Sequence, residues 1–203
     1  DLMLSIFPFE KEWYAKRAPG LPVEFVGHPL CDRYPDLEFR EPNELHDPPR
    51  LLLLPGSRAK EISRHLPVMA VAASRLNAEL MIVFPNESIA AHARLLTPAV
   101  ADWDLRIGGL HDALAEADVA IASSGTVTLE CAWFRVPTVV LYKTSWITYL
   151  LGRLFVKVKH IAMPNVLAER EVFPEFIQRA ATAKNLAREA SRLIDDHGRR
   201  KTL

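Results

Sequence analysis

Short apolar runs alternate along the chain with longer stretches in which apolar residues recur every three or four positions. Uninterrupted short runs are typical of strands, and the longer periodic stretches are typical of helices. We therefore expect strands at residues 1–7, 23–26, 51–54, 80–84, 105–107, 119–122 and 138–141. Helices are expected at residues 9–17, 67–77, 86–96, 111–116, 126–134 and 182–197.

One helix boundary depends on a proline. Pro67 would interrupt a helix that ran from Lys60, because proline lacks the amide that a helix interior needs. At the first position of a helix this missing donor costs nothing. We therefore expect a short turn after Arg58 and a helix that begins at Pro67.

Strands and helices alternate with short connections over residues 51–141. Leu51–Leu54 is apolar throughout, as in a parallel strand that is covered on both faces. This order predicts an α/β fold with a doubly wound, Rossmann-like parallel sheet. A polar, proline-rich stretch at residues 33–49 predicts a connector between a first segment, residues 1–32, and the sheet. Because residues 1–7 resemble a strand that is entered midway, we expect the chain to be a segment of a longer protein.

The composition argues for a folded domain without an electrostatic preference for polyanions. Of the 203 residues, 49% are hydrophobic, and 25 basic residues balance 25 acidic ones. No overall field favours nucleic acid, so we expect no nucleic-acid partner. The cysteines, Cys31 and Cys131, show no metal-ligand spacing; we expect two reduced structural thiols in a cytosolic protein and no metal site.

Two loops that follow strands carry the residues with the clearest chemistry. In doubly wound sheets, ligands bind beyond the carboxyl ends of the strands, where these loops lie. Ser124-Gly125-Thr126 joins a strand to a helix, and its backbone amides can face a phosphate. Glu130, about one turn further, can accept hydrogen bonds from both hydroxyls of a ribose. The alternative is a capped helix start with a solvated glutamate.

Arg58 ends the other loop, which begins at Pro55. Its guanidinium can hold a diphosphate bidentately and stabilise charge on a leaving group. An ordinary surface arginine is the alternative. The loop lacks the Gly-Lys-Ser/Thr ending of a P-loop, and no Gly-x-Gly-x-x-Gly follows a strand. A P-loop ATPase and a nicotinamide- or flavin-dependent oxidoreductase are therefore not supported.

Five short motifs in a fixed order give the sequence a specific resemblance. They are Phe7-Pro8-Phe9-Glu10, Gly27-His28-Pro29, Leu54-Pro55-Gly56-Ser57-Arg58, Ser124-Gly125-Thr126 with Leu129-Glu130, and Met163-Pro164-Asn165. Together they resemble the lipid A disaccharide synthase family over essentially the whole chain. The resemblance implies the C-terminal half of a glycosyltransferase B fold. It assigns residues 1–32 to the end of the acceptor domain, 33–49 to a connector, 50–160 to the UDP-sugar donor domain, and 161–203 to C-terminal helices that return towards the first domain.

The same resemblance implies an activity. The donor is UDP-2,3-diacylglucosamine and the acceptor is 2,3-diacylglucosamine 1-phosphate (lipid X), with lipid A disaccharide 1-phosphate and UDP as products and no cofactor. Arg58, Ser124 and the amides around Gly125 and Thr126 are implied to hold the diphosphate, and Glu130 the ribose. The general base is expected in the acceptor domain, mostly absent here, so none is predicted in this chain.

Further substrate-binding candidates follow from the resemblance: Asn165, near the donor sugar or phosphates, and Glu171 and Gln178. The alternative for Asn165 is a helix N-cap after Pro164, and both roles can hold together. His28, in a Gly-His-Pro turn, is interpreted as structural rather than catalytic.

Lipid substrates suggest that the protein works at a membrane surface. Residues 146–155 are apolar and precede Lys157 and Lys159, as in an interfacial membrane helix or an acyl-chain wall; a core helix is the alternative. The family implies a cytoplasmic protein, peripheral to the inner membrane of a Gram-negative-type bacterium. It also implies a homodimer that exchanges C-terminal elements.

Two other functions remain open from the sequence. Another UDP-sugar enzyme of the same fold, such as a UDP-N-acetylglucosamine 2-epimerase, would share the phosphate loop and Glu130. A non-catalytic UDP-binding module is the alternative from a different class, because a donor domain alone can bind UDP and transfer nothing.

Overall fold

The computed structural model describes residues 2–34, 45–145 and 159–202 of the chain. By its internal contacts the chain divides into two compact units, Asp1–Glu38 and Phe39–Leu203. The larger unit contains the predicted sheet.

The first unit is a strand–helix–strand motif followed by a short helix. Its elements are β1 (Met3–Ser5), α1 (Pro8–Arg17), β2 (Val23–Phe25) and α2 (Leu30–Arg33). The two strands are parallel neighbours. A carboxylate oxygen of Glu10, in the first turn of α1, accepts hydrogen bonds from the amides of Ile6 and Phe7 at 3.2 and 3.0 Å. Glu10 thereby satisfies amide donors that the start of a helix leaves without a partner.

The second unit is built on a sheet of six parallel strands in the order β5-β4-β3-β6-β7-β8. The strands are β3 (Arg50–Leu54), β4 (Glu79–Phe84), β5 (Asp104–Ile107), β6 (Val119–Ser123), β7 (Thr138–Tyr142) and β8 (Glu175–Ile177). The chain moves outward from β3 to β5 and then returns to the other side of β3. The direction reverses between β3 and β6, which confirms the predicted doubly wound sheet and places its switch point there.

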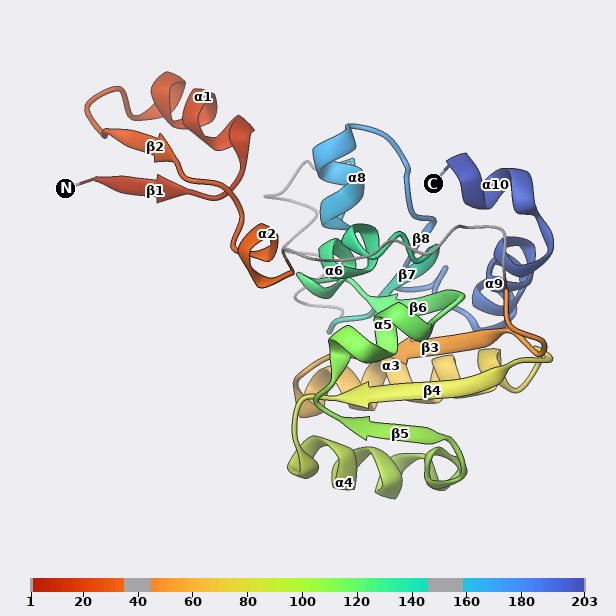
Figure 1. Cartoon of the computed structure of the whole chain (residues 1–203). Coiled ribbons are helices and arrows are strands. Elements are labelled where there is room, and N and C mark those ends of the chain that lie inside the picture. Colours follow the sequence, from red (N-terminus) through yellow and green to blue (C-terminus); the bar gives the residue numbers. More distant parts are fainter. Residues whose placement is uncertain (1, 35–44, 146–158, 203) are drawn as a thin grey trace. The chain divides into compact units, whose positions relative to one another are not determined.

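Helices cover both faces of this sheet (Figure 1). α3 packs with α4 and α9 on one face, and α5, α6 and α8 lie on the other. The helices are α3 (Ala59–Ala73), α4 (Glu87–Leu96), the 3-10 helix η1 (Pro98–Asp102), α5 (Leu110–Glu116), α6 (Val127–Trp133), α8 (Met163–Ala168), α9 (Ala183–Asp195) and α10 (His197–Thr202). Because both faces are covered, the central strands β3 and β6 are almost wholly buried and apolar, as the uninterrupted run Leu51–Leu54 predicted.

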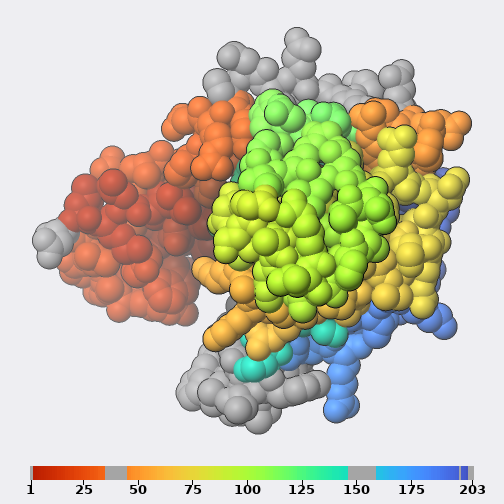
Figure 2. Space-filling model, turned by 90° about the horizontal axis from the view of Figure 1, so that it is seen from below, coloured from red at the N-terminus to blue at the C-terminus, as the bar shows by residue number. Residues whose placement is uncertain are grey.

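The outer edge of the sheet, at β5, carries charge. Figure 2 shows this edge in yellow-green, with α4 and β5 in front of the rest of the unit. Arg106 of β5 contacts Asp104 at 2.7 Å and Glu116 at 2.8 Å. Charged side chains on an exposed edge strand disfavour pairing with another chain. Hydrogen bonding to Arg106 also lowers the pKa of Glu116 below its usual value.

The prediction for the start of α3 was wrong. The helix begins at Ala59 and contains Pro67, which costs one backbone hydrogen bond. Two features of the fold outweigh that cost. Ile62, Leu66 and Met69 form one buried stripe against the sheet, and the Glu61 carboxylate binds the amides at the start of the helix.

The strand β8 was not predicted. Pro174 precedes it, and only Glu175–Ile177 pairs with β7, at the other edge of the sheet. A strand this short carries too few residues for a period of two to be recognised. The expected return of residues 161–203 towards an acceptor domain stays a prediction.

Among the residues that the structure describes, no helix is both long and apolar enough to cross a membrane. The apolar stretch 146–155 lies outside the described residues. Its interfacial or core role therefore stays a prediction.

Candidate functional site

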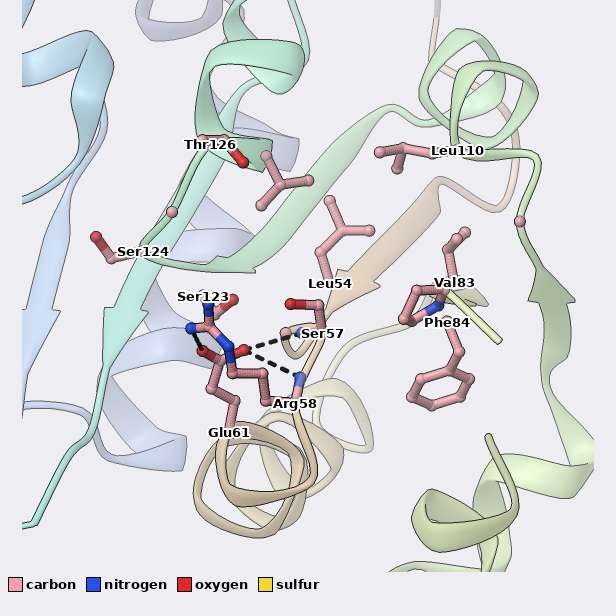
Figure 3. A pocket seen from close by; sticks show the side chains of 15 residues that line it. Leu54, Ser57, Arg58, Glu61, Val83, Phe84, Leu110, Ser123, Ser124 and Thr126 are labelled. Atoms are coloured by element: carbon pink, nitrogen blue, oxygen red, sulfur yellow. Dashed lines mark hydrogen bonds and ion pairs between the residues drawn. The ribbon is translucent and has the colours of Figure 1, made fainter. Parts of the chain in front are cut away.

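A cavity of about 550 Å³ opens at the carboxyl ends of the central strands. Figure 3 shows it between the loops that follow β3 and β6, with the ends of β4 and β5 at its other side. Its lining residues are Leu54, Gly56, Ser57, Arg58, Glu61, Val83, Phe84, Pro85, Gly108, Leu110, Ser123, Ser124, Gly125, Thr126 and Val127. The structure thus brings together four of the predicted site residues, Arg58, Ser124, Gly125 and Thr126, at the switch point of the sheet.

The loop between β3 and α3 is shaped around one carboxylate. Glu61 accepts hydrogen bonds from the amides of Ser57 at 2.9 Å and Arg58 at 3.3 Å, and from the Arg58 guanidinium at 3.1 Å (Figure 3). Gly56 has a φ of +123°, a conformation open mainly to glycine. The Arg58 side chain is 80% exposed, so it can reach a ligand in the cavity.

The loop between β6 and α6 presents its backbone and the exposed Thr126 to the cavity. The hydroxyl of Ser124 donates to the carbonyl of Ile161 at 3.0 Å, and that of Thr128 donates to the carbonyl of Gly125 at 2.7 Å. Gly125 and Thr126 are exposed, and a side chain at Gly125 would meet no atom. The loop therefore offers amides and open space, which suits the close approach of an anion.

Glu130 lies in α6, one turn beyond this loop, and is 9% exposed. It does not line the cavity as the cavity stands in this structure. Its contact with a ribose stays a prediction.

Asn165 lies inside α8 and is fully buried. Its amide nitrogen donates to the carbonyl of Phe173 and to Glu175, both at 2.7 Å. Its oxygen accepts from the amides of Val172 and Phe173 at 2.8 and 2.7 Å. The N-cap of α8 is Ala162, so the capping role considered for Asn165 was wrong. With all four hydrogen bonds made inside the chain, the side chain fixes the turn between α8 and β8.

Two other predicted residues also lie apart from the cavity. Glu171 is exposed in the turn after α8. Gln178 is buried. Its side-chain oxygen accepts from the backbone amide of Thr144 at 2.9 Å, and its side-chain nitrogen donates to the carbonyl of Thr144 at 3.1 Å. Gln178 therefore anchors the loop after β7.

Sequence reasoning missed Glu61 and the far wall of the cavity, Val83–Pro85 with Gly108 and Leu110. One signal was present for Glu61, since a glutamate three residues after a helix cap has the spacing of a capping box. The far wall could be found only from the strand order, which places β4 beside β3.

His65 connects the β3–α3 loop to the end of β7. It is 1% exposed, with Nδ1 2.9 Å from the carbonyl oxygen of Pro55 and Nε2 accepting from the amide of Lys143 at 3.0 Å. Because a carbonyl can only accept, the neutral ring carries its proton on Nδ1. Burial lowers the pKa of His65 below its usual value, although the carbonyl oxygens of Pro55 and Lys143, 2.9 Å from Nδ1 and 3.2 Å from Nε2, favour the protonated ring.

We expect His65 to make the folded chain less stable as the pH falls below its ordinary pKa of 6.5. In that window the unfolded chain binds a proton that the folded chain does not, so the free energy of unfolding decreases with decreasing pH. His65→Gln should reduce this dependence by up to about 1.4 kcal/mol per pH unit. Urea unfolding between about pH 7.5 and 5.5 measures it. The partly exposed His92, replaced by glutamine, serves as control; equal slopes for His65→Gln and the parent would contradict a buried neutral ring.

The structure also bears on the cysteines and on metal binding. Cys131 is buried, which raises the pKa of its thiol to about 12, whereas Cys31 is exposed. Within residues 2–34, 45–145 and 159–202, no three side chains of the histidine, cysteine, aspartate and glutamate types gather as metal ligands.

Comparison with known proteins gives one family. A family model described as lipid-A-disaccharide synthetase matches residues 1–203. The lipid-A-disaccharide synthase of Thiobacillus denitrificans is 40% identical over 99% of this chain and 56% of its own length. Those of Nitrosococcus oceani and Pseudomonas putida are each 38% identical over the whole chain, which covers 55% and 56% of their lengths. The chain spans about half the length of the curated relatives it matches.

Similar solved structures support the fold. A protein from Listeria monocytogenes, described as a UDP-N-acetylglucosamine 2-epimerase, superposes with a TM-score of 0.62 at 17% identity, over the whole chain and 53% of its own. A pneumococcal O-GlcNAc transferase, solved with UDP and GlcNAc, gives a TM-score of 0.52 at 10% identity, over the whole chain and 41% of its own. At these identities the likeness concerns the fold alone.

Proposed function

Because this chain belongs to the family of lipid-A-disaccharide synthetases, we propose that it supplies the donor-binding part of a glycosyltransferase of lipid A synthesis. The proposed reaction joins UDP-2,3-diacylglucosamine to lipid X, giving lipid A disaccharide 1-phosphate and UDP. One observation carries this proposal: the loops ending in Arg58 and containing Gly125 converge on one cavity at the switch point of the sheet.

The chemistry of the cavity suits a nucleoside diphosphate. Its volume of about 550 Å³ lies within the usual range for small-ligand sites. Arg58 offers a guanidinium from one loop, and residues 125–127 offer amides from the other. Both stabilise the negative charge that develops on UDP as the bond between the sugar and the β-phosphate breaks. In the proposal, Glu130 accepts the ribose hydroxyls.

The remaining parts of the reaction are assigned to the rest of the family's chain. The acceptor hydroxyl attacks the donor sugar, and its proton passes to a general base of the acceptor domain. We propose that residues 1–32 end that domain, that 33–49 connect it to the donor domain at 50–160, and that 161–203 return to it. We also propose that the enzyme acts on both lipid substrates at the cytoplasmic face of the inner membrane. It forms a homodimer whose subunits exchange C-terminal elements.

Arg58→Ala and Glu130→Ala are each expected to weaken UDP binding by about 1 to 3 kcal/mol, because each removes charged hydrogen bonds to the ligand. Titration of UDP by calorimetry measures this, with ADP to test selectivity for the base. Arg75→Ala is the matched control, since Arg75 is exposed and does not line the cavity. Unchanged UDP affinity in both variants would contradict the site.

Turnover separates the transferase from a non-catalytic UDP-binding module. We expect a chain joined to a complete acceptor domain to release UDP from the donor only when lipid X is present. UDP binding without any transfer by this folded, complete protein would favour the module.

A further inference from the structure

Glu61 holds the groups that an anion at the β3–α3 loop would otherwise use. Its Oε2 accepts from the amides of Ser57 and Arg58, and its Oε1 accepts from Nη1 of Arg58. Two backbone donors and a guanidinium are the usual partners of a phosphate at a helix start. Glu61 therefore acts on this loop as an internal anion.

The close approach of Glu61 requires the glycine before it. A Cβ placed on Gly56 would lie 2.6 Å from Oε2 and 2.7 Å from the Cβ of Glu61. Such distances leave no room for any side chain at Gly56 while Glu61 keeps its position. The absence of a side chain at Gly56 therefore allows the Glu61 carboxylate, on the first turn of α3, to reach the cavity wall.

The hydrogen bonds of Glu61 differ in how easily they exchange. The amide bonds are set by the geometry of the first helical turn, where Glu61 has the capping-box position. The bond to Arg58 joins a side chain that is 80% exposed to one that is 28% exposed. Water and salt screen such an ion pair, so it contributes little to stability. Arg58 can thus change partner while Glu61 stays on the amides.

We propose that Glu61 is a positioning residue that holds Arg58 at the cavity wall in the empty site and releases it to the diphosphate of the nucleotide. The proposal rests on the proposed function. Because Glu61 keeps the amides of Ser57 and Arg58, the diphosphate is bound by the Arg58 guanidinium and the Gly125–Val127 side of the cavity. The ion pair with Glu61 competes with the diphosphate for Arg58, which lowers the affinity for UDP and speeds its release as product.

Glu61→Gln tests this, because glutamine keeps an oxygen for the amides and loses the charge that holds Arg58. We expect UDP to bind about three- to tenfold more tightly at low salt, with a smaller gain at high salt, where charges are screened. In an Arg58→Ala background the same substitution should change the affinity by less than about twofold, since its main partner is gone. Glu87→Gln is the matched control: Glu87 also begins a helix and pairs with an arginine, Arg94, outside the cavity lining.

A second measurement uses the unaltered chain and does not depend on the folding of a variant. In NMR spectra, added UDP should shift the side-chain signals of Arg58 and the backbone amides of Thr126 and Val127. The backbone amides of Ser57 and Arg58 should shift much less, because Glu61 keeps them.

The results of these experiments distinguish failure of the proposed Glu61 role from failure of the proposed function. If the parent binds UDP and Glu61→Gln binds it equally or more weakly, Glu61 does not have this role, and the proposed function stands. Amide shifts at Ser57 and Arg58 as large as those at Thr126 would also overturn it, because the phosphate would then displace Glu61. If neither parent nor variant binds UDP, the proposed function fails as well.

Discussion

Gly56→Ala is expected to destabilise the second unit by about 3 kcal/mol or more and to remove measurable UDP binding. The backbone at Gly56 has a φ of +123°, and the new methyl group would lie 2.6 Å from a Glu61 oxygen. Both the strained backbone and the clash push the loop away from the cavity. Denaturant unfolding measures the stability, and calorimetry measures the binding.

Two other glycines serve as controls for this change. A side chain at Gly20 or Gly125 would meet no atom within 4 Å, and neither glycine has the strained φ. Gly20→Ala should therefore leave both stability and binding unchanged. Gly125→Ala should leave stability unchanged and weaken UDP binding, because its methyl group would occupy space at the proposed phosphate site. A Gly56→Ala protein as stable as the parent would contradict the close contact with Glu61.

Asn165→Asp is expected to cost about 3 to 5 kcal/mol of stability, although the two side chains have the same shape. The nitrogen that donates to Phe173 and Glu175 becomes an oxygen, which in the ionised form can only accept and lies 2.7 Å from another carboxylate; a proton on the new side chain restores only one of the two bonds. The site is buried, so no water replaces the lost bonds. Thermal and urea unfolding measure the loss.

Asn185→Asp is the matched control for Asn165. The amide nitrogen of Asn185 donates to one carbonyl, that of Ala180, in an exposed position at the start of α9. Its replacement should therefore cost less than about 1 kcal/mol. If both variants unfold alike, the network around Asn165 contributes little. If Asn165→Asp is stable but fails to bind UDP, the residue contacts the ligand directly, as the family resemblance implied.

The sequence was sufficient for features that depend on local pattern. Uninterrupted apolar runs predicted two buried parallel strands, Leu51–Leu54 and Val119–Ala122, and the glycines of the two following loops marked where those strands end. The order of the strands brings these loops to the same end of the sheet. The location of Arg58 and the Gly125 loop in one cavity could therefore be predicted from the fold class. The family membership implied by the motifs was confirmed by the comparisons.

Features that depend on where side chains point were not accessible from the sequence. Asn165 has the sequence context of a cap, but its partners lie in residues 172–175, which only the folded turn brings near. Pro67 signals a helix start, yet the buried stripe of α3 and the Glu61 cap tolerate it inside the helix. In each case long-range packing outweighed a local propensity.

The site forms during folding only when the neighbouring strands β3 and β6 pair. They pair although residues 55–118 lie between them in the chain, so their union closes a far longer loop than the pairing of β3 with β4. Closing a longer loop costs more entropy, and pairings of distant segments slow folding. The two loops that line the cavity lie at the ends of these paired strands. A ligand that contacts both loops therefore stabilises the pairing of β3 with β6, by a free energy that rises with the logarithm of the ligand concentration above its dissociation constant.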